Sequence, residues 1–92
     1  MGNIKYSVKG TDRALYNISG AFLHLTHDDF IIFGSFGPES CSIESSILDV
    51  YATYQQKDKI LTISGNETDL MRELIETEFN RRNLNIKLDL IN

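Results

Sequence analysis

The feature that most constrains the fold of this chain is an amphipathic segment between residues 66 and 82. It reads NETDLMRELIETEFNRR, with acidic residues at its start, two arginines at its end and apolar residues at helical spacing. This charge distribution suits the dipole of an α-helix, and the apolar stripe requires a second surface to cover it. We therefore predict a helix over 66–82 that packs through Leu70, Met71, Leu74, Ile75 and Phe79.

The ends of this predicted helix carry further signals. Asn66 precedes the apolar stripe as the expected capping residue, and Asp69 follows three positions later, as in a capping box. Glu78 and Arg82 are four residues apart, so we expect their side chains to pair across one helical turn.

Strand-like patterns occupy much of the remaining chain. IKYSVK (4–9) and LNIKLDLI (84–91) alternate apolar with polar residues, which is typical of strands with one buried face. ALYNI (14–18) and AFLHLT (21–26) are interpreted as two short strands divided by Ser19 and Gly20. FIIFGSF (30–36) is apolar on both faces, which predicts a central strand.

The segment 46–56 is compatible with two structures. As a helix it has Ser46 as a cap and apolar residues at helical spacing, whereas as a strand it alternates and is rich in Val, Tyr and Thr. We favour a hairpin, because QKDK supplies a turn into the apolar ILTI. The expected fold is one α+β domain over residues 1–92. It comprises an antiparallel-rich sheet of about five to six strands with the C-terminal helix on one face, and a second helix near 46–56 as the alternative.

The stretch FLHLTHDD (22–29) is the strongest candidate for a chemical site. In a regular strand His24 and His27 point to opposite faces, and a structural metal site needs three or four converging ligands. The preferred interpretation is a hairpin tip at His27, Asp28 and Asp29, in which the Asp side chains bind nearby backbone amides. We therefore expect no metal site.

Two other features are interpreted as structural. GSFGPES (34–40) lacks the Gly-Lys-Ser/Thr ending of a phosphate-binding P-loop and the glycine spacing of a dinucleotide site, which leaves a sharp turn. Cys41 lies near Glu39 and Glu44, which would raise rather than lower the pKa of its thiol. We predict no catalytic residue and no cofactor.

Part of the chain resembles a known family. GAFLHLTHDDFIIFG (20–34) is similar to the segment of bacterial PH-like and GRAM domains that reads Gly-x-Leu-x-Leu-Thr, then a turn and an Ile-Phe strand. SIESSILDV, KILTI and the helix at 66–82 follow in a compatible order. The resemblance implies a ligand-binding or lipid-binding domain without catalytic groups, although Asp28 and Asp29 stand where that pattern usually carries a basic residue.

Charge and length exclude several classes of protein. Thirteen Asp and Glu against nine Lys and Arg give a net charge of −4, which argues against direct binding of nucleic acid. No apolar run approaches the roughly 20 residues that span a bilayer. The single cysteine suits a reducing compartment. We expect a cytoplasmic protein without membrane contact.

The remaining expectation is protein binding. We predict a small acidic, non-enzymatic inhibitor or regulatory factor of a larger protein complex, acting as a monomer or homodimer. By analogy of size and charge, it would resemble immunity proteins or virus- and mobile-element-encoded inhibitors of nucleic-acid-binding defence complexes. A PH-like or GRAM-like domain is the alternative, and a small metal-dependent hydrolase ranks third. The acidic charge suits a partner with a basic surface. The predicted contacts with this partner are Asp28, Asp29, Glu67, Asp69, Glu73, Glu76, Tyr51 and Tyr54.

Overall fold

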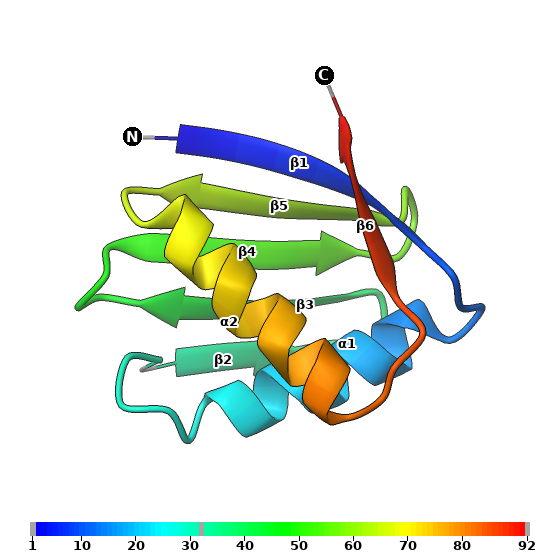
Figure 1. Cartoon of the computed structure of the whole chain (residues 1–92), viewed down its shortest axis with the longest axis horizontal. Coiled ribbons are helices and arrows are strands. Elements are labelled where there is room, and N and C mark those ends of the chain that lie inside the picture. Colours follow the sequence, from blue (N-terminus) through cyan, green and yellow to red (C-terminus); the bar gives the residue numbers. More distant parts are fainter. Residues whose placement is uncertain (1, 32, 92) are drawn as a thin grey trace.

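A computed structural model describes residues 2–31 and 33–91, which form one six-stranded sheet and two helices (Figure 1). The strands lie in the order β2-β3-β4-β5-β1-β6, and every neighbouring pair is antiparallel. The predicted α+β class is confirmed. In chain order the elements are β1 (Gly2–Lys9), α1 (Ala14–Leu25), β2 (Phe33–Phe36), β3 (Ser40–Ser45), β4 (Val50–Gln55), β5 (Ile60–Gly65), α2 (Thr68–Arg81) and β6 (Lys87–Ile91).

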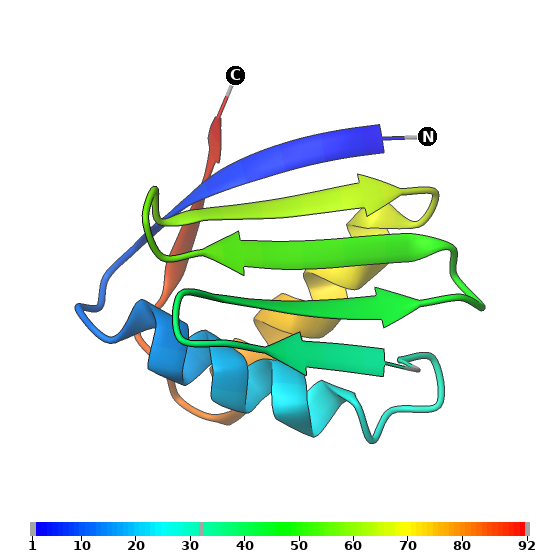
Figure 2. The ribbon, with the colours of Figure 1, turned by 180° about the vertical axis from the view of Figure 1, so that it is seen from behind.

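The two faces of the sheet have different environments. Alternate residues of β3, β4, β5 and β1 are buried under the two helices, including Ile43, Ala52, Leu61 and Tyr6. The other residues of these strands form the opposite face, which we call the open face because no helix of the described residues covers it. Figure 2 looks onto this face, with α2 behind the strands.

The predicted C-terminal helix is confirmed as α2, although its buried face differs in detail. Met71, Ile75 and Phe79 are buried, whereas Leu70 and Leu74 are only partly covered. The helix is therefore rotated slightly about its axis, so that the side carrying Met71, Ile75 and Phe79 faces the sheet more directly than the side carrying Leu70 and Leu74. Neither helix in the described ranges is long and apolar enough to cross a membrane.

The predicted contacts at the ends of α2 are wrong. Glu67 occupies the capping position without a side-chain cap, and the Asn66 amide donates instead to the Asp49 carboxylate, at 2.6 Å. Glu78 pairs with Arg81 rather than Arg82, whose guanidinium lies beside Gly20 of α1. Asn66 thus joins the start of α2 to the turn between β3 and β4.

The two strands predicted over 14–18 and 21–26 are wrong, because these residues form the single helix α1. Ala14, Ile18, Phe22 and Leu25 are buried at helical spacing. Gly20 lies in mid-helix and faces the end of α2, where an added Cβ would come 3.0 Å from the Arg82 guanidinium. A larger side chain at this position would displace the Arg82 side chain, and the glycine itself lowers the helix propensity of α1.

The hairpin favoured over 46–56 is confirmed, and the alternative helix there is wrong. β4 and β5 pair along their full length, and the second helix of the fold is α1 instead. The predicted central strand over 30–36 is also wrong. β2 is a four-residue edge strand, and both Phe33 and Phe36 are largely exposed.

Candidate protein-binding surface

Asp69, Glu73 and Glu76 form an acidic outer surface on α2, and Glu67 precedes them at the capping position of the helix. Glu67, Asp69, Glu73 and Glu76 are all exposed. Glu76 is partly neutralised, because the Arg72 guanidinium lies 3.4 Å from its carboxylate one turn away. The remaining acids near the start of the helix also favour its dipole, so they have a structural role besides any contact.

Asp28 and Asp29 lie apart from the start of α2. They belong to the turn after α1, where the Asp28 carboxylate accepts a hydrogen bond of 2.9 Å from the Phe30 N–H. The predicted capping of a local amide is therefore observed, although the turn leads from a helix rather than forming a hairpin tip. The next strand, β2, is three strands away from β5, from which α2 begins. The fold does not bring these acids beside Glu67.

The two tyrosines predicted as contacts have opposite environments. Tyr51 is 42% exposed on the open face, whereas Tyr54 is fully buried on the core face. The prediction for Tyr54 is wrong, because residues three apart in a strand point to opposite faces. Its hydroxyl donates to the Gln56 side chain at 2.9 Å, and burial raises the pKa of the Tyr54 phenol.

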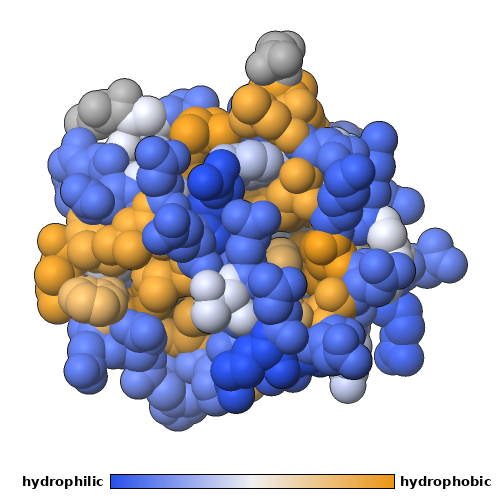
Figure 3. Space-filling model, viewed as in Figure 1, coloured by the Kyte–Doolittle hydropathy of each residue, from blue (hydrophilic) through white to orange (hydrophobic). Residues whose placement is uncertain are grey.

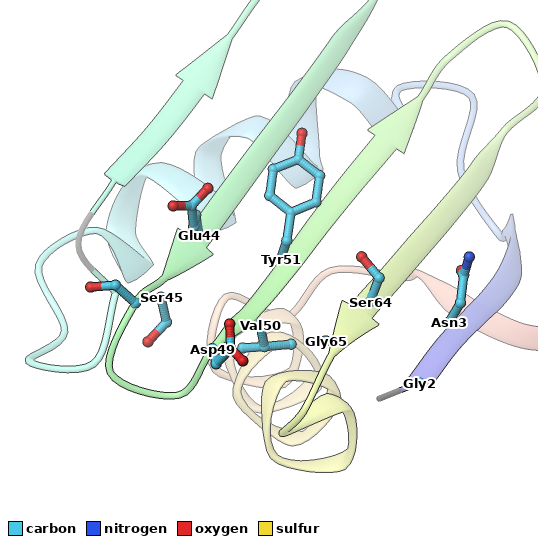
Figure 4. Close-up of a pocket in the computed structure, with 10 residues that line it drawn as sticks. Gly2, Asn3, Glu44, Ser45, Asp49, Val50, Tyr51, Ser64 and Gly65 are labelled. Carbon is cyan, nitrogen blue, oxygen red and sulfur yellow. The ribbon is translucent and has the colours of Figure 1, made fainter.

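Tyr51 belongs to a row of side chains that crosses the open face. Strand register places Tyr51 opposite Glu44 on one side and Ser64 on the other, and Glu44 is in turn opposite Phe33. In Figure 4 the Tyr51 ring stands between Glu44 and Ser64, and Asn3 lies beyond Ser64 on β1. An open hollow of about 710 Å³ adjoins this row at the end of the sheet where Asp49 lies.

Phe33 is a surface residue that the sequence pattern did not predict. Its side chain is 54% exposed, although the surrounding apolar run predicted burial on both faces. Gly34 and Ser35 follow it directly, and the Gly37–Pro38 turn lies close by. A short strand so close to turn residues indicates an edge position, and this was the available signal.

The two histidines are closer together than the sequence predicted. His24 lies in the last turn of α1 and His27 just beyond it, and their ring centroids are 6.4 Å apart. The predicted opposite-face geometry is wrong, because residues three apart share one side of a helix. Glu78 lies 3.8 Å from His24. Among the described residues, however, no group of three His, Cys, Asp or Glu side chains is arranged to hold a metal ion.

We expect that His24 and His27 do not bind a metal ion. Adding Zn²⁺ to the untagged protein should leave its melting temperature unchanged, because a ligand stabilises a fold only if it binds the native state. His24→Ala and His27→Ala should show the same indifference to Zn²⁺, with a modest loss of stability for His24→Ala through its contact with Glu78. Stoichiometric zinc in elemental analysis of the untagged protein would contradict this expectation.

Two buried polar groups close to α1 do not form a reactive site. Cys41 is 1% exposed, and burial raises the pKa of its thiol to about 11, against a smaller opposing effect of the Ser19 side chain. The thiol is therefore neutral at physiological pH. Glu78 is 5% exposed and receives two hydrogen bonds from Arg81, at 2.6 and 3.3 Å. The positive charge of the Arg81 guanidinium therefore balances the negative charge of the buried Glu78 carboxylate.

Comparison with known protein families, curated proteins and solved structures finds no match to this chain. The residues that suggested PH-like and GRAM domains include Gly20 to Leu25, which form the second half of α1. The case for a function therefore rests on the surface of this molecule.

Proposed function

We propose that this chain is a non-enzymatic protein-binding module that inhibits or regulates a larger protein complex, and that it binds through the open face around Tyr51. One observation carries the proposal. Phe33 and Tyr51, 54% and 42% exposed, stand in one row on either side of Glu44, on a sheet face that no helix of the described residues covers.

The chemistry of this row suits a protein contact. Aromatic side chains supply large apolar areas with few rotatable bonds, and tyrosine is among the residues that contribute most to binding energy at interfaces. The Glu44 carboxylate between the two rings can accept hydrogen bonds from a lysine or arginine of the partner. The surrounding serine and threonine side chains supply the polar rim typical of such contacts.

The acidic outer surface of α2 has a different role in this proposal. α2 packs on the core face, so Glu73 and Glu76 lie on the opposite side of the molecule from Tyr51. Together with the net charge of −4, they favour encounter with a basic partner, such as a protein surface that grips nucleic acid. This contribution acts on the association rate and decreases with ionic strength.

The test begins with capture of the partner from the native source and its identification by mass spectrometry. With the purified partner, Tyr51→Ala should weaken binding by about 2 kcal/mol, or roughly 30-fold, if Tyr51 is a central contact. Tyr16→Ala is the matched control, because Tyr16 is 69% exposed on α1 and should leave affinity unchanged. Far-UV circular dichroism checks that both variants fold.

The same assay separates the two surfaces. Glu73→Lys with Glu76→Lys should slow association at low salt and leave dissociation nearly unchanged. The proposal for the open face is wrong if Tyr51→Ala binds as tightly as the parent while the double variant both associates more slowly and dissociates faster. In that case α2 is the contact.

A further inference from the structure

The outer edge of β6 is an unprotected edge of the sheet. β6 packs extensively only against β1, and within residues 2–31 and 33–91 no element runs along its other side. The other edge strand, β2, is only four residues long, so it offers few backbone groups for pairing. An exposed strand edge is a template for pairing with another strand.

Strand register shows which backbone groups of β6 face outward. The Val8 N–H donates to the Lys59 carbonyl at 2.9 Å, so the backbone of Val8 points toward β5. Directions alternate along a strand, so Ser7 and Lys9 point toward β6, where they oppose Asp89 and Lys87. The N–H and C=O groups of Leu88 and Leu90 therefore point away from the sheet.

The side chains of β6 are also incompletely covered. Leu90 is 60% exposed and Ile91 41% exposed, although Leu90 lies on the core face opposite Tyr6. Figure 3 shows an apolar area where β6 ends, next to the C-terminus. Lys87 and Asp89 lie on the open face, with their side chains 77% and 37% exposed.

We propose that two copies of this chain pair through β6, antiparallel, with a two-fold axis at Leu88. Leu88 then lies opposite Leu88 of the second copy, and its outward N–H and C=O groups form the central hydrogen bonds. Each Lys87 faces Asp89 of the second copy in a non-hydrogen-bonded pair, where side chains are closest. On the core face, the exposed Leu90 lies beside Ile86 of the second copy.

Charge complementarity selects this register and this occupant. In the dimer, the residues whose backbone groups point outward must lie opposite one another, and these are every second residue of β6. A two-fold axis that pairs them must therefore pass through a residue and not between two residues. An axis one residue later places Asp89 against Asp89, and an axis one residue earlier places Lys87 against Lys87; like charges directly opposite destabilise a sheet. Because Lys87 precedes Asp89 on the same face of β6, an antiparallel second copy of β6 places each lysine opposite an aspartate.

The dimer has a geometric consequence. A two-fold axis through an antiparallel strand pair is perpendicular to the sheet, so it keeps equivalent faces on the same side. The two six-stranded sheets become continuous, and both open faces point in one direction. This inference concerns the edge of the sheet and does not depend on the proposed function.

The first test uses charge reversal and rescue. Sedimentation equilibrium from micromolar to millimolar protein at low salt should show the mass rising from 10.5 kDa toward twice that value. Lys87→Asp and Asp89→Lys alone should each weaken self-association at least about tenfold, because each places like charges opposite one another. An equimolar mixture of the two variants should recover dimers, because unlike charges again face each other.

Lys57→Asp is the matched control, because Lys57 is exposed in the turn between β4 and β5 and should leave self-association unchanged. A wild-type protein that stays monomeric over the whole range overturns the proposal. So does a mixture of the two folded variants that remains monomeric, since that result excludes this register.

A second measurement needs no variant. Amide hydrogen exchange of Leu88 and Leu90 in the wild-type protein should slow as concentration rises, because their N–H groups become hydrogen-bonded only in the dimer. The amides of Lys87 and Asp89 bond to β1 and should be protected at every concentration. If the protein forms dimers but the exchange rates of the Leu88 and Leu90 amides do not change with concentration, the interface lies elsewhere. This result would overturn the proposal.

Discussion

Phe22→Ala should lower the free energy of unfolding by about 3 to 5 kcal/mol, the usual cost of truncating a buried aromatic residue. Phe22 is fully buried on α1, which packs against β3 and α2. Removing its ring leaves a cavity in the hydrophobic core beneath α1. Since small domains are stable by only about 5 to 15 kcal/mol, the loss should be plain in urea denaturation curves.

Leu23→Ala is the matched control for this prediction. Leu23 is the next residue of the same helix and is 56% exposed, so its truncation should change stability by less than about 0.5 kcal/mol. In the strand first expected for 21–26, Leu23 and Leu25 would share a face and have similar effects. A cost for Leu23→Ala close to that for Leu25→Ala would contradict the helical structure of α1.

The helix α1 illustrates where local pattern fails. Its sequence contains Gly20 in mid-helix, which disfavours a helix, together with residues that alternate in short windows. The helical spacing of its buried residues, from Ala14 to Leu25, is recognisable only when all three turns are considered together. Tertiary packing overrides local preference here, because the apolar face of α1 is buried against β3 and α2.

Elements with one continuous period were predicted more accurately. β1 and α2 have an unbroken period of two or 3.6 residues, and the structure buries the face that each pattern indicates, apart from the slight rotation of α2. The period does not determine which strands lie at the edges. β2 and β6 are edge strands because of the order in which the chain returns to the sheet, and that order depends on contacts between distant residues.

The candidate surface shows the same division. Tyr51 and Tyr54 carry the same functional group, and only the assignment of 50–55 to a strand separates them into an exposed and a buried residue. Phe33 joins Tyr51 through the register of three strands, which a single sequence does not reveal. The exposure of Asp69, Glu73 and Glu76 on α2 was predictable, because the opposite side of that helix carries the apolar stripe.

Gly65→Ala should destabilise the protein by about 3 kcal/mol, at the upper end of the cost of one strained backbone position. Gly65 ends β5 with a φ of +119°, a conformation that residues with a Cβ rarely adopt. An added Cβ would also lie 2.9 Å from the Val50 Cα and would press on the Asp49 carbonyl. That carbonyl accepts a hydrogen bond of 2.8 Å from the Asn66 N–H, so we expect the substitution to strain the contact between the β3–β4 turn and the start of α2.

Gly37→Ala provides the control that isolates this effect. A Cβ at Gly37 would meet only the Ser40 carbonyl oxygen, at an ordinary contact distance of 3.6 Å. Its effect on stability should therefore stay within about 0.5 kcal/mol, or be slightly favourable because the unfolded chain loses freedom. Thermal and urea denaturation of both variants measure the difference. Equal stability of the two variants would show that Gly65 does not hold the left-handed conformation on which the junction of β5 and α2 depends.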